Sequence, residues 1–153
     1  MTGETLQPDV CRRARRWTVL DEDDLLQALR YHWDNSGRDE DAAHEIYHDD
    51  AVLEVPQSGE RFEGVENFKE WRRQYPAALT FHTRRVSHRE DLVVVENLIS
   101  YDGAPWMYTV SLLEFSGDKV ARERIYIMDG WEAPEWRAPW RAATPADPPP
   151  PQL

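Results

Sequence analysis

The spacing of apolar residues divides the chain into a helical first half and a strand-rich second half. The first helical stripe has intervals of three and four and consists of Leu25, Leu26, Leu29 and Trp33. The acidic residues 21–24 supply a capping side chain and negative charge at its start. We therefore predict a helix from residue 21 to about residue 35.

Two more helices are predicted before the strands begin. After a break at Ser36 and Gly37, a short helix places Ala43, Ile46 and Tyr47 on one face and leads into a strand at 51–55. A turn follows at Pro56, Ser58 and Gly59. Beyond Gly64, a third helix ends at Pro76 and presents Phe68, Trp71 and Tyr75 at helical spacing.

Alternating apolar residues then predict four long strands separated by turn residues. The strands are expected at about 80–88, 92–101, 106–115 and 120–128. Helices followed by an antiparallel meander favour an α+β fold in which the helices cover one face of a curved sheet. This cone-shaped α+β barrel would leave a cavity between the two layers.

Composition limits the domain count and the classes of partner. The 153 residues are 41% hydrophobic, which suits one domain. We place it at 21–132, with a flexible N-terminal arm at 1–20 and a proline-rich, disordered C-terminal tail at 133–153. The formal net charge of -11 argues against binding to nucleic acid or to an anionic membrane surface.

Cysteine content and hydropathy bear on the compartment. Cys11 is the only cysteine, so no disulfide can form within the chain. The start does not resemble a signal peptide, and no apolar run approaches the ~20 residues of a membrane helix. We therefore expect a cytoplasmic protein.

One short motif matches the zinc-protease helix signature. His44, Glu45 and His48 have the spacing in which two histidines bind the metal and the glutamate activates water. However, Ala43, Ile46 and Tyr47 define the packed face, which turns both histidines toward solvent. The preferred interpretation is a pair of surface histidines and no metal site. Motifs for nucleotide cofactors and for a serine nucleophile elbow are absent.

The segment from Tyr47 to Pro56, followed by Gly64 and the helix at Phe68, resembles the ketosteroid isomerase and SnoaL-like group of the nuclear-transport-factor-2-like (NTF2-like) superfamily. The later stretch 114–120 is similar to the turn between the last two strands of that family. The resemblance implies a cofactor-independent protein that takes a small apolar or polycyclic molecule. It also implies a homodimer that pairs through the outer sheet face, with contributions from Trp106, Tyr108 and Tyr126.

The resemblance also assigns residues to family positions, with one important departure. The isomerase base falls on Val55, which cannot take a proton, so steroid isomerisation by that mechanism is not expected. The oxyanion donor of the isomerase falls on Ser111, which can donate a hydrogen bond. A family tyrosine aligns with Tyr31, or with Leu29 if a longer loop is allowed. Arg72 lies near another tyrosine position and brings positive charge to the pocket or to solvent.

Strand alternation adds further candidates for the pocket wall. Along the last strand, Glu123 and Asp129 share a face with apolar residues, and burial disfavours a charged carboxylate, which suits a general acid or base. The other interpretation of Glu123 is an ion pair with an arginine such as Arg84, Arg122 or Arg124. Asn97 faces inward, either to orient a substrate carbonyl or in a structural hydrogen bond.

Three other residues complete the predicted site. His82 and Arg84 share a face of their strand and form a possible polar pair near the sheet centre. Trp71 would suit a flat apolar ligand, although such a residue is more often a core or dimer contact. The leading hypothesis is a small-molecule isomerase, cyclase, dehydratase or epoxide hydrolase that uses acid-base chemistry through Glu123. The alternative is a non-catalytic binding or assembly module of the same fold.

Overall fold

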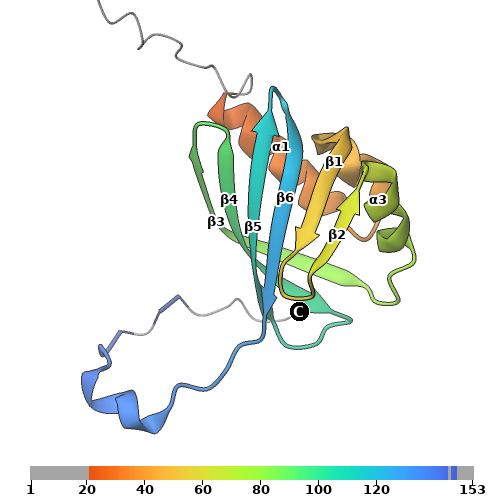
Figure 1. The fold of residues 1–153 in the computed structure, drawn as a ribbon. Helices are drawn as coiled ribbons and strands as arrows, with labels where there is room; N and C mark the ends of the chain where they lie inside the picture. The colour runs from red at the N-terminus through yellow and green to blue at the C-terminus, as the bar shows by residue number, and fades with distance from the viewer. Residues whose placement is uncertain (1–20, 145, 148–153) are drawn as a thin grey trace, which may run out of the picture.

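A computed structural model describes residues 21–144 and 146–147, so the predicted arm at 1–20 lies outside the described residues. Helices come first and a long meander of strands follows, as the apolar spacing predicted (Figure 1). The elements are α1 (Glu22–Asn35), α2 (Glu40–Ala43), η1 (His44–Ile46), β1 (Tyr47–Val55), β2 (Glu60–Glu63), α3 (Val65–Arg73), β3 (Leu79–Arg89), β4 (Leu92–Tyr101), β5 (Met107–Ser116), β6 (Lys119–Met128) and η2 (Glu135–Trp140).

The six strands form one curved, open sheet. Their order is β2-β1-β6-β5-β4-β3, and only the β1–β6 pair is parallel. This arrangement brings the first strand of the chain beside the last. Helices α1 and α3 lie on one face of the sheet and leave the other face without a helix (Figure 1). We call these the inner and outer faces, and the α+β prediction is confirmed.

The core fills the space between the helices and the inner face. Leu25 and Leu29 of α1 and Phe68 of α3 are almost completely buried against Leu53 and Val95 of the sheet. Removal of this much apolar surface from water is the main stabilising contribution to the fold. Leu26, which was predicted on the same helical stripe, is instead 36% exposed.

Caps and turns explain where these elements begin and end. Asp21 caps α1 because its carboxylate accepts a hydrogen bond from the Asp24 backbone nitrogen at 2.8 Å. Before α3 the chain needs a positive φ of 84° at Gly64, a conformation that glycine adopts without strain. None of the helices in the described part of the chain is long and apolar enough to cross a membrane.

Two local predictions are wrong. Tyr47 begins β1 rather than continuing a helix, and the hairpin partner strand Glu60–Glu63 was not predicted. Within the predicted disordered tail, Glu135–Trp140 forms a 3-10 helix that contains Pro139. A proline ring fixes φ near the value that a 3-10 turn requires, so this short helix accommodates it.

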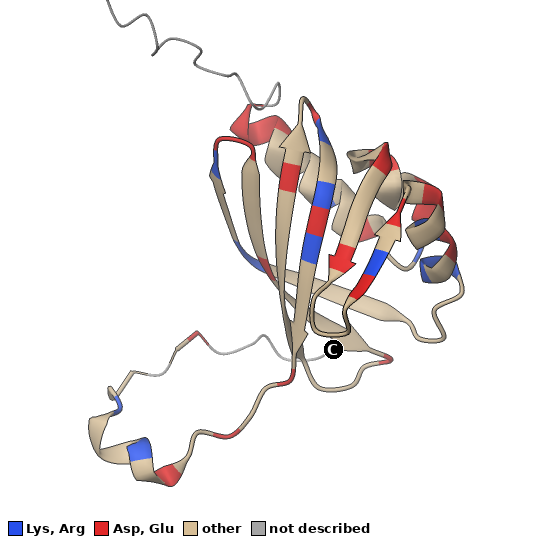
Figure 2. Cartoon of the chain, viewed as in Figure 1, with Lys and Arg blue, Asp and Glu red and all other residues tan. Residues whose placement is uncertain are grey.

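Charge is distributed unevenly over the outer face. Glu114 lies near the end of β5, and Arg122 and Arg124 lie in the first half of β6, whereas the stretches 107–113 and 125–128 carry no charged residue. Figure 2 shows the charged residues of these two strands gathered toward one end. On β5 and β6, the outer face therefore has a charged part and an uncharged part. The uncharged part lies next to the point where the chain leaves β6.

Candidate functional site

A set of polar side chains lies buried between the helices and the inner face of the sheet. We call it the buried polar cluster, and its members are His32, Glu40, His44, Tyr47, Arg72 and Glu123. Five of these residues are buried, and Arg72 reaches them from α3. Polar groups at such depth are costly unless each finds a partner.

Glu123 lies at the centre of this cluster and is completely buried. The parallel pairing of β1 with β6 sets Glu123 opposite Leu53, so both residues face the core. The hydroxyl of Tyr47 donates a hydrogen bond to Glu123 Oε2. The second carboxyl oxygen, Oε1, is buried without a hydrogen-bond partner among the described residues. The two oxygens of this carboxyl group are therefore not equivalent.

Arg72 lies near this carboxyl group and contacts a histidine. One guanidinium nitrogen, Nη1, lies 2.9 Å from His44 Nε2. Because a guanidinium can only donate, Nε2 accepts and the ring proton of His44 must lie on Nδ1. That proton is donated to the backbone oxygen of Glu40 at 2.6 Å. The tautomer of His44 is thus assigned by its two partners.

Burial keeps both histidines of the cluster neutral. Desolvation lowers the pKa of His32 to about 4, against the opposing influence of Glu123. Desolvation, reinforced by the charge of Arg72, lowers the pKa of His44 to about 3. Neither histidine carries a charge near neutral pH, so both act there as hydrogen-bonding groups.

Tyr47 and Arg72 keep their ordinary protonation states. Burial, and then the charge of Glu123, raise the pKa of Tyr47 well above its ordinary value, so its hydroxyl remains a donor. Burial opposes the charge of Arg72, but Tyr47 and Glu123 nearby hold its pKa above the ordinary value. The cluster therefore contains a permanent cation close to the Glu123 carboxyl group.

A row of polar side chains continues along the inner face. Asn97 on β4 pairs in register with Thr109 on β5, and Ser111 follows two residues later. All three are buried, and their side-chain oxygens, with the Asn97 amide nitrogen, have no hydrogen-bond partner among the described residues. Since Ser111 pairs with Ile125 and Leu113 pairs with Glu123, Ser111 and Glu123 are diagonal neighbours. Unpartnered donors and acceptors thus lie beside the carboxyl group.

Solvent reaches the edge of the cluster through a hollow between the α1–α2 loop and the end of α3. This hollow has a volume of about 380 Å³, and its lining includes Arg38, Glu40, Arg72, Tyr75 and Leu79. Glu40 and Arg72 therefore belong both to the buried polar cluster and to the wall of the hollow. Because Glu123 itself is completely enclosed, a ligand reaches it only when neighbouring side chains move.

The structure brings together some of the predicted site residues. Glu123 lies beside Arg72 and next to the row that contains Asn97 and Ser111. Glu123 accepts a hydrogen bond from Tyr47, and none of the arginines suggested as its ion-pair partner is paired with it. Arg124 instead pairs with Glu114 at 3.5 Å on the outer face.

Other predicted residues lie around the edges of the core. Val55, at the end of β1, is partly buried against the core. The ring of Trp71 packs on that of Phe62, with the two ring centroids 5.5 Å apart. The indole nitrogen of Trp71 is buried without a partner among the described residues. Tyr31 is 48% exposed, so it lies on the side of α1 away from the buried stripe and not beside Glu123.

The remaining predicted residues lie away from the inner face. β3 is an edge strand, so the predicted place of His82 and Arg84 near the sheet centre is wrong. A register shift between Thr83 and Arg85 also breaks the alternation on which their pairing was based. His82 is exposed, with its ring 6.5 Å from that of Trp106.

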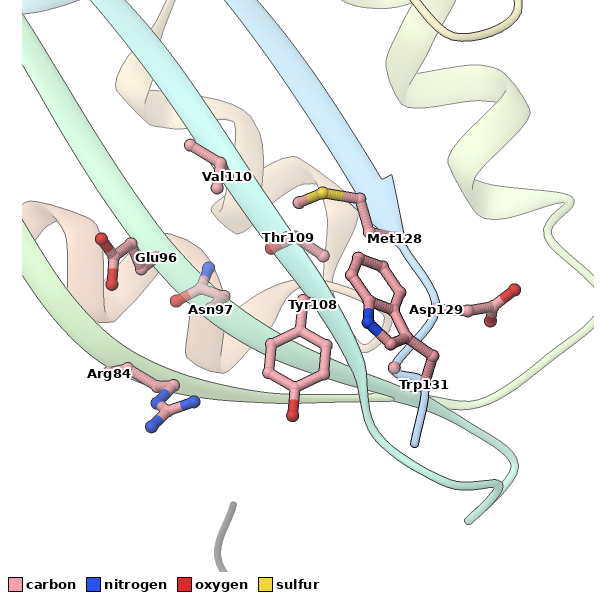
Figure 3. Close-up of a pocket in the computed structure, with 10 residues that line it drawn as sticks. Arg84, Glu96, Asn97, Tyr108, Thr109, Val110, Met128, Asp129 and Trp131 are labelled. Carbon is pink, nitrogen blue, oxygen red and sulfur yellow. The ribbon is translucent and has the colours of Figure 1, made fainter. Parts of the chain in front are cut away.

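Arg84 and Asp129 line a separate hollow on the outer face, which we call the outer hollow (Figure 3). It has a volume of about 440 Å³, and Tyr108, Val110 and Met128 supply much of its apolar wall. Tyr108 and Val110 alternate with the inner residues Thr109 and Ser111, and this alternation places them on the helix-free side. Asp129 is exposed just beyond β6, not on the inner face as predicted.

Sequence reasoning missed His32, Glu40 and Tyr47 as members of the site. His32 lies seven residues after Leu25, a spacing that does place it on the buried side of α1. His44, predicted to face solvent, is buried, while His48 bonds the Ser116 backbone oxygen at 2.6 Å. Among the described residues, no group of three or more histidine, cysteine or acidic side chains is placed to hold a metal ion.

Solved structures show the same fold. An NTF-2-like protein of unknown function from Burkholderia xenovorans LB400 is 40% identical, with a TM-score of 0.74, and the match covers 81% of this chain and 98% of that one. A putative ketosteroid isomerase from Kribbella flavida DSM 17836 is 21% identical, with a TM-score of 0.69, and the match covers 79% and 90%. A putative polyketide cyclase from Sinorhizobium meliloti is 21% identical, with a TM-score of 0.59, and the match covers 70% and 100%.

A family model decides the classification. We found no match to the chain among curated proteins. The model of the SnoaL-like domain matches residues 27–123, a range that extends from α1 to Glu123 itself and includes all six residues of the buried polar cluster. The chain therefore belongs to the SnoaL-like family within the NTF2-like superfamily.

Proposed function

We propose that this protein is a cofactor-independent enzyme that moves a proton within a small, largely apolar molecule. The observation that carries the proposal is the state of Glu123, whose carboxyl group is completely buried with Oε2 bonded to Tyr47 and Oε1 unpartnered among the described residues. A positioned carboxylate next to apolar walls is an effective general base. Leu113 and Ile125 supply such walls beside it.

The surrounding groups fit the other half of such a reaction. When Glu123 removes a proton from a carbon next to a carbonyl, negative charge develops on the carbonyl oxygen. Ser111 and Asn97 offer buried, unpartnered donors that would hydrogen-bond to this oxygen. The protonated Glu123 then returns the proton to the same or a neighbouring carbon, which completes an exchange or an isomerisation. The Arg72 guanidinium nearby adds positive charge to the site.

The first test is deuterium incorporation into a panel of cyclic ketones and β,γ-unsaturated ketones in D₂O, measured by mass spectrometry. Glu123→Gln keeps an acceptor for Tyr47 but cannot take a proton. We expect this change to lower the exchange rate by at least about 100-fold. Glu114→Gln is the matched control, because Glu114 is a partly exposed carboxylate on the outer face. Exchange that survives in Glu123→Gln would remove Glu123 from the mechanism.

A second candidate function is ligand binding without catalysis. It is favoured by Val55, an apolar residue at the position where the ketosteroid isomerases, which this chain resembles, carry their catalytic base. Native mass spectrometry of the freshly purified protein separates the two functions. A co-purified organic molecule that is unchanged after long incubation with the protein supports binding alone, whereas its conversion supports catalysis.

A further inference from the structure

The hollow between the α1–α2 loop and the end of α3 contains positive charges that the protein itself does not neutralise. We call it the polar hollow, and its charged lining residues are Arg38, Asp39, Glu40, Asp41, Arg72 and Arg73. Arg73 is paired with Asp41, whose Oδ1 lies 2.6 Å from Arg73 Nη2. Arg38 and Arg72 form no ion pair with any described residue. Two guanidinium groups in this wall are therefore left without a counter-charge.

Arg72 is held in a fixed direction by uncharged partners. Its Nη1 donates to Nε2 of His44 at 2.9 Å, and its guanidinium carbon lies 5.6 Å and 5.5 Å from the ring centroids of Phe68 and Trp71. His44 is neutral, because burial lowers its pKa to about 3. Glu123 is close enough to influence Arg72 but forms no ion pair with it. A cation withdrawn from water without a counter-charge is costly, so an anion bound here would be stabilised.

The carboxyl groups of the same wall are used elsewhere. Asp39 caps α2, where its side chain accepts a backbone hydrogen bond. Glu40 Oε1 accepts from the Gly37 backbone nitrogen at 2.6 Å, and Glu40 Oε2 lies 3.4 Å from Nδ1 of His44. Since Nδ1 and Nε2 lie on different sides of the imidazole, the His44 ring separates Glu40 from Arg72. These carboxyl groups therefore leave the guanidinium of Arg72 free to pair with a ligand.

A second donor without a partner lies beside Arg72. The indole nitrogen of Trp71 is buried and has no hydrogen-bond partner among the described residues. Indole and guanidinium groups can donate hydrogen bonds but cannot accept them. The ligand group that satisfies both is an acceptor with negative charge, and a carboxylate matches the planar fork of a guanidinium. A phosphate group, with a charge of about -1.5 to -2, would be repelled more strongly by Asp39 and Glu40.

We infer that the polar hollow binds the carboxylate of an organic acid through Arg72, and that the substrate of the proposed proton transfer is a keto acid with an apolar body. The second part of this inference rests on the proposed function. Tyr47 donates to Glu123 and also borders Arg72, so the carboxylate site and the proposed base are neighbours of one hydroxyl group. Ala77 and Leu79 add apolar surface to the hollow, whose volume of about 380 Å³ suits a small ligand.

Isothermal titration calorimetry with full-length protein tests the carboxylate site without any need for catalysis. The probes are benzoate, cyclohexanecarboxylate and phenylpyruvate, each compared with its neutral amide. We expect the acids to bind at least about tenfold more tightly than the amides, and Arg72→Met to abolish this preference. Arg61→Met is the matched control, because Arg61 is an exposed arginine of β2 that pairs with Glu54.

Glu123→Gln separates this inference from the proposed function. It should bind benzoate at least as tightly as the wild-type chain does, since it removes a carboxyl group near Arg72. In D₂O, after subtraction of the uncatalysed exchange, phenylpyruvate should show a lower KM than its methyl ester, and Arg72→Met should raise the KM for the acid. Benzoate binding that depends on Arg72 would support the carboxylate site even if no ketone exchanges. Exchange that depends on Glu123 but is equal for acid and ester would keep the proposed function and overturn the keto-acid assignment.

Three results would overturn the carboxylate site itself. They are acids that bind no more tightly than their amides, an Arg72→Met variant that binds benzoate as the wild-type chain does, and inorganic phosphate that binds more tightly than every acid in the panel. Circular dichroism verifies folding. If Arg72→Met does not fold, Arg72→Lys takes its place, because it keeps the charge but loses the planar fork and should weaken benzoate binding several-fold.

Discussion

At the scale of single residues, the hydrogen bond between Tyr47 and Glu123 links the first strand of the chain to the last. The two residues are 76 positions apart, yet both are completely enclosed in the core. A buried carboxyl group that loses its donor keeps its full desolvation cost, whereas the hydrogen bond itself contributes only modestly. The stability of the cluster therefore depends on every partner remaining in place.

Substitution of Tyr47 by phenylalanine tests this dependence. Tyr47→Phe removes the hydroxyl and leaves Glu123 Oε2 buried without its donor. We expect the free energy of unfolding to fall by about 1–3 kcal/mol. Urea denaturation measures the change, and Tyr31→Phe, at an exposed position, is the control. Combining Tyr47→Phe with Glu123→Gln should cost less than the two separate effects added together. Simple additivity would show that the two side chains act independently.

The two neutral histidines make stability depend on pH in a defined direction. The unfolded chain protonates histidine near pH 6.5, but the folded pKa values of His32 and His44 are lowered to about 4 and about 3. Between these values the unfolded state binds more protons, so stability is lost as the pH falls below about 6.5. The loss for each histidine approaches about 1.4 kcal/mol per pH unit.

Urea denaturation between pH 7 and pH 5 measures this loss before most carboxylates begin to titrate. His32→Asn replaces the ring with a neutral group that can still donate to the Ala43 backbone oxygen, which lies 2.5 Å from His32 Nδ1. We expect this variant to have a shallower pH dependence than wild type. His82→Gln, at an exposed position, should keep the wild-type slope. Equal slopes in all three proteins would show that His32 does not contribute.

At the scale of elements, the sequence predicted most of what is governed by apolar periodicity. The strands β3 to β6 and the helices α1 and α3 agree with prediction to within a few residues. Tyr47 was misplaced because its spacing from Ala43 also fits a helix, and only the pairing of β1 with β6 reveals the strand. The short strand β2 has the sequence Glu-Arg-Phe-Glu, which has no apolar alternation from which a strand could be predicted.

The candidate site was predicted less completely than the fold, for a physical reason. Strand alternation was enough to place Glu123, Asn97 and Ser111 inside. The contacts of Glu123 with Tyr47 and Arg72 depend on how helices and strands pack in three dimensions, which a one-dimensional pattern does not contain. A bulge near Arg84 likewise reverses the face of every residue beyond it, and nothing in the local sequence marks its position.

At the scale of the whole molecule, net charge and the exposed tryptophans Trp131, Trp136 and Trp140 have opposite effects on self-association. Each chain carries a formal net charge of -11, so two copies repel one another at low ionic strength. Indoles associate through apolar contact, which added salt does not screen. The balance between these effects predicts how the homodimer that the family resemblance implies responds to salt.

Raising NaCl from 10 mM to 300 mM should tighten the dimer several-fold. The range of charge interactions falls from about 30 Å at 0.01 M salt to less than about 8 Å at 0.3 M, so the repulsion is lost while the apolar contact remains. Sedimentation velocity at several salt concentrations measures the dissociation constant directly. The variant with Trp136→Ser and Trp140→Ser should stay largely monomeric throughout, because it lacks the contact that screening would reveal. A wild-type dimer that weakens with added salt would mean that ion pairs, such as those available to Arg84 and Glu96 around the outer hollow, hold the copies together in place of the indoles.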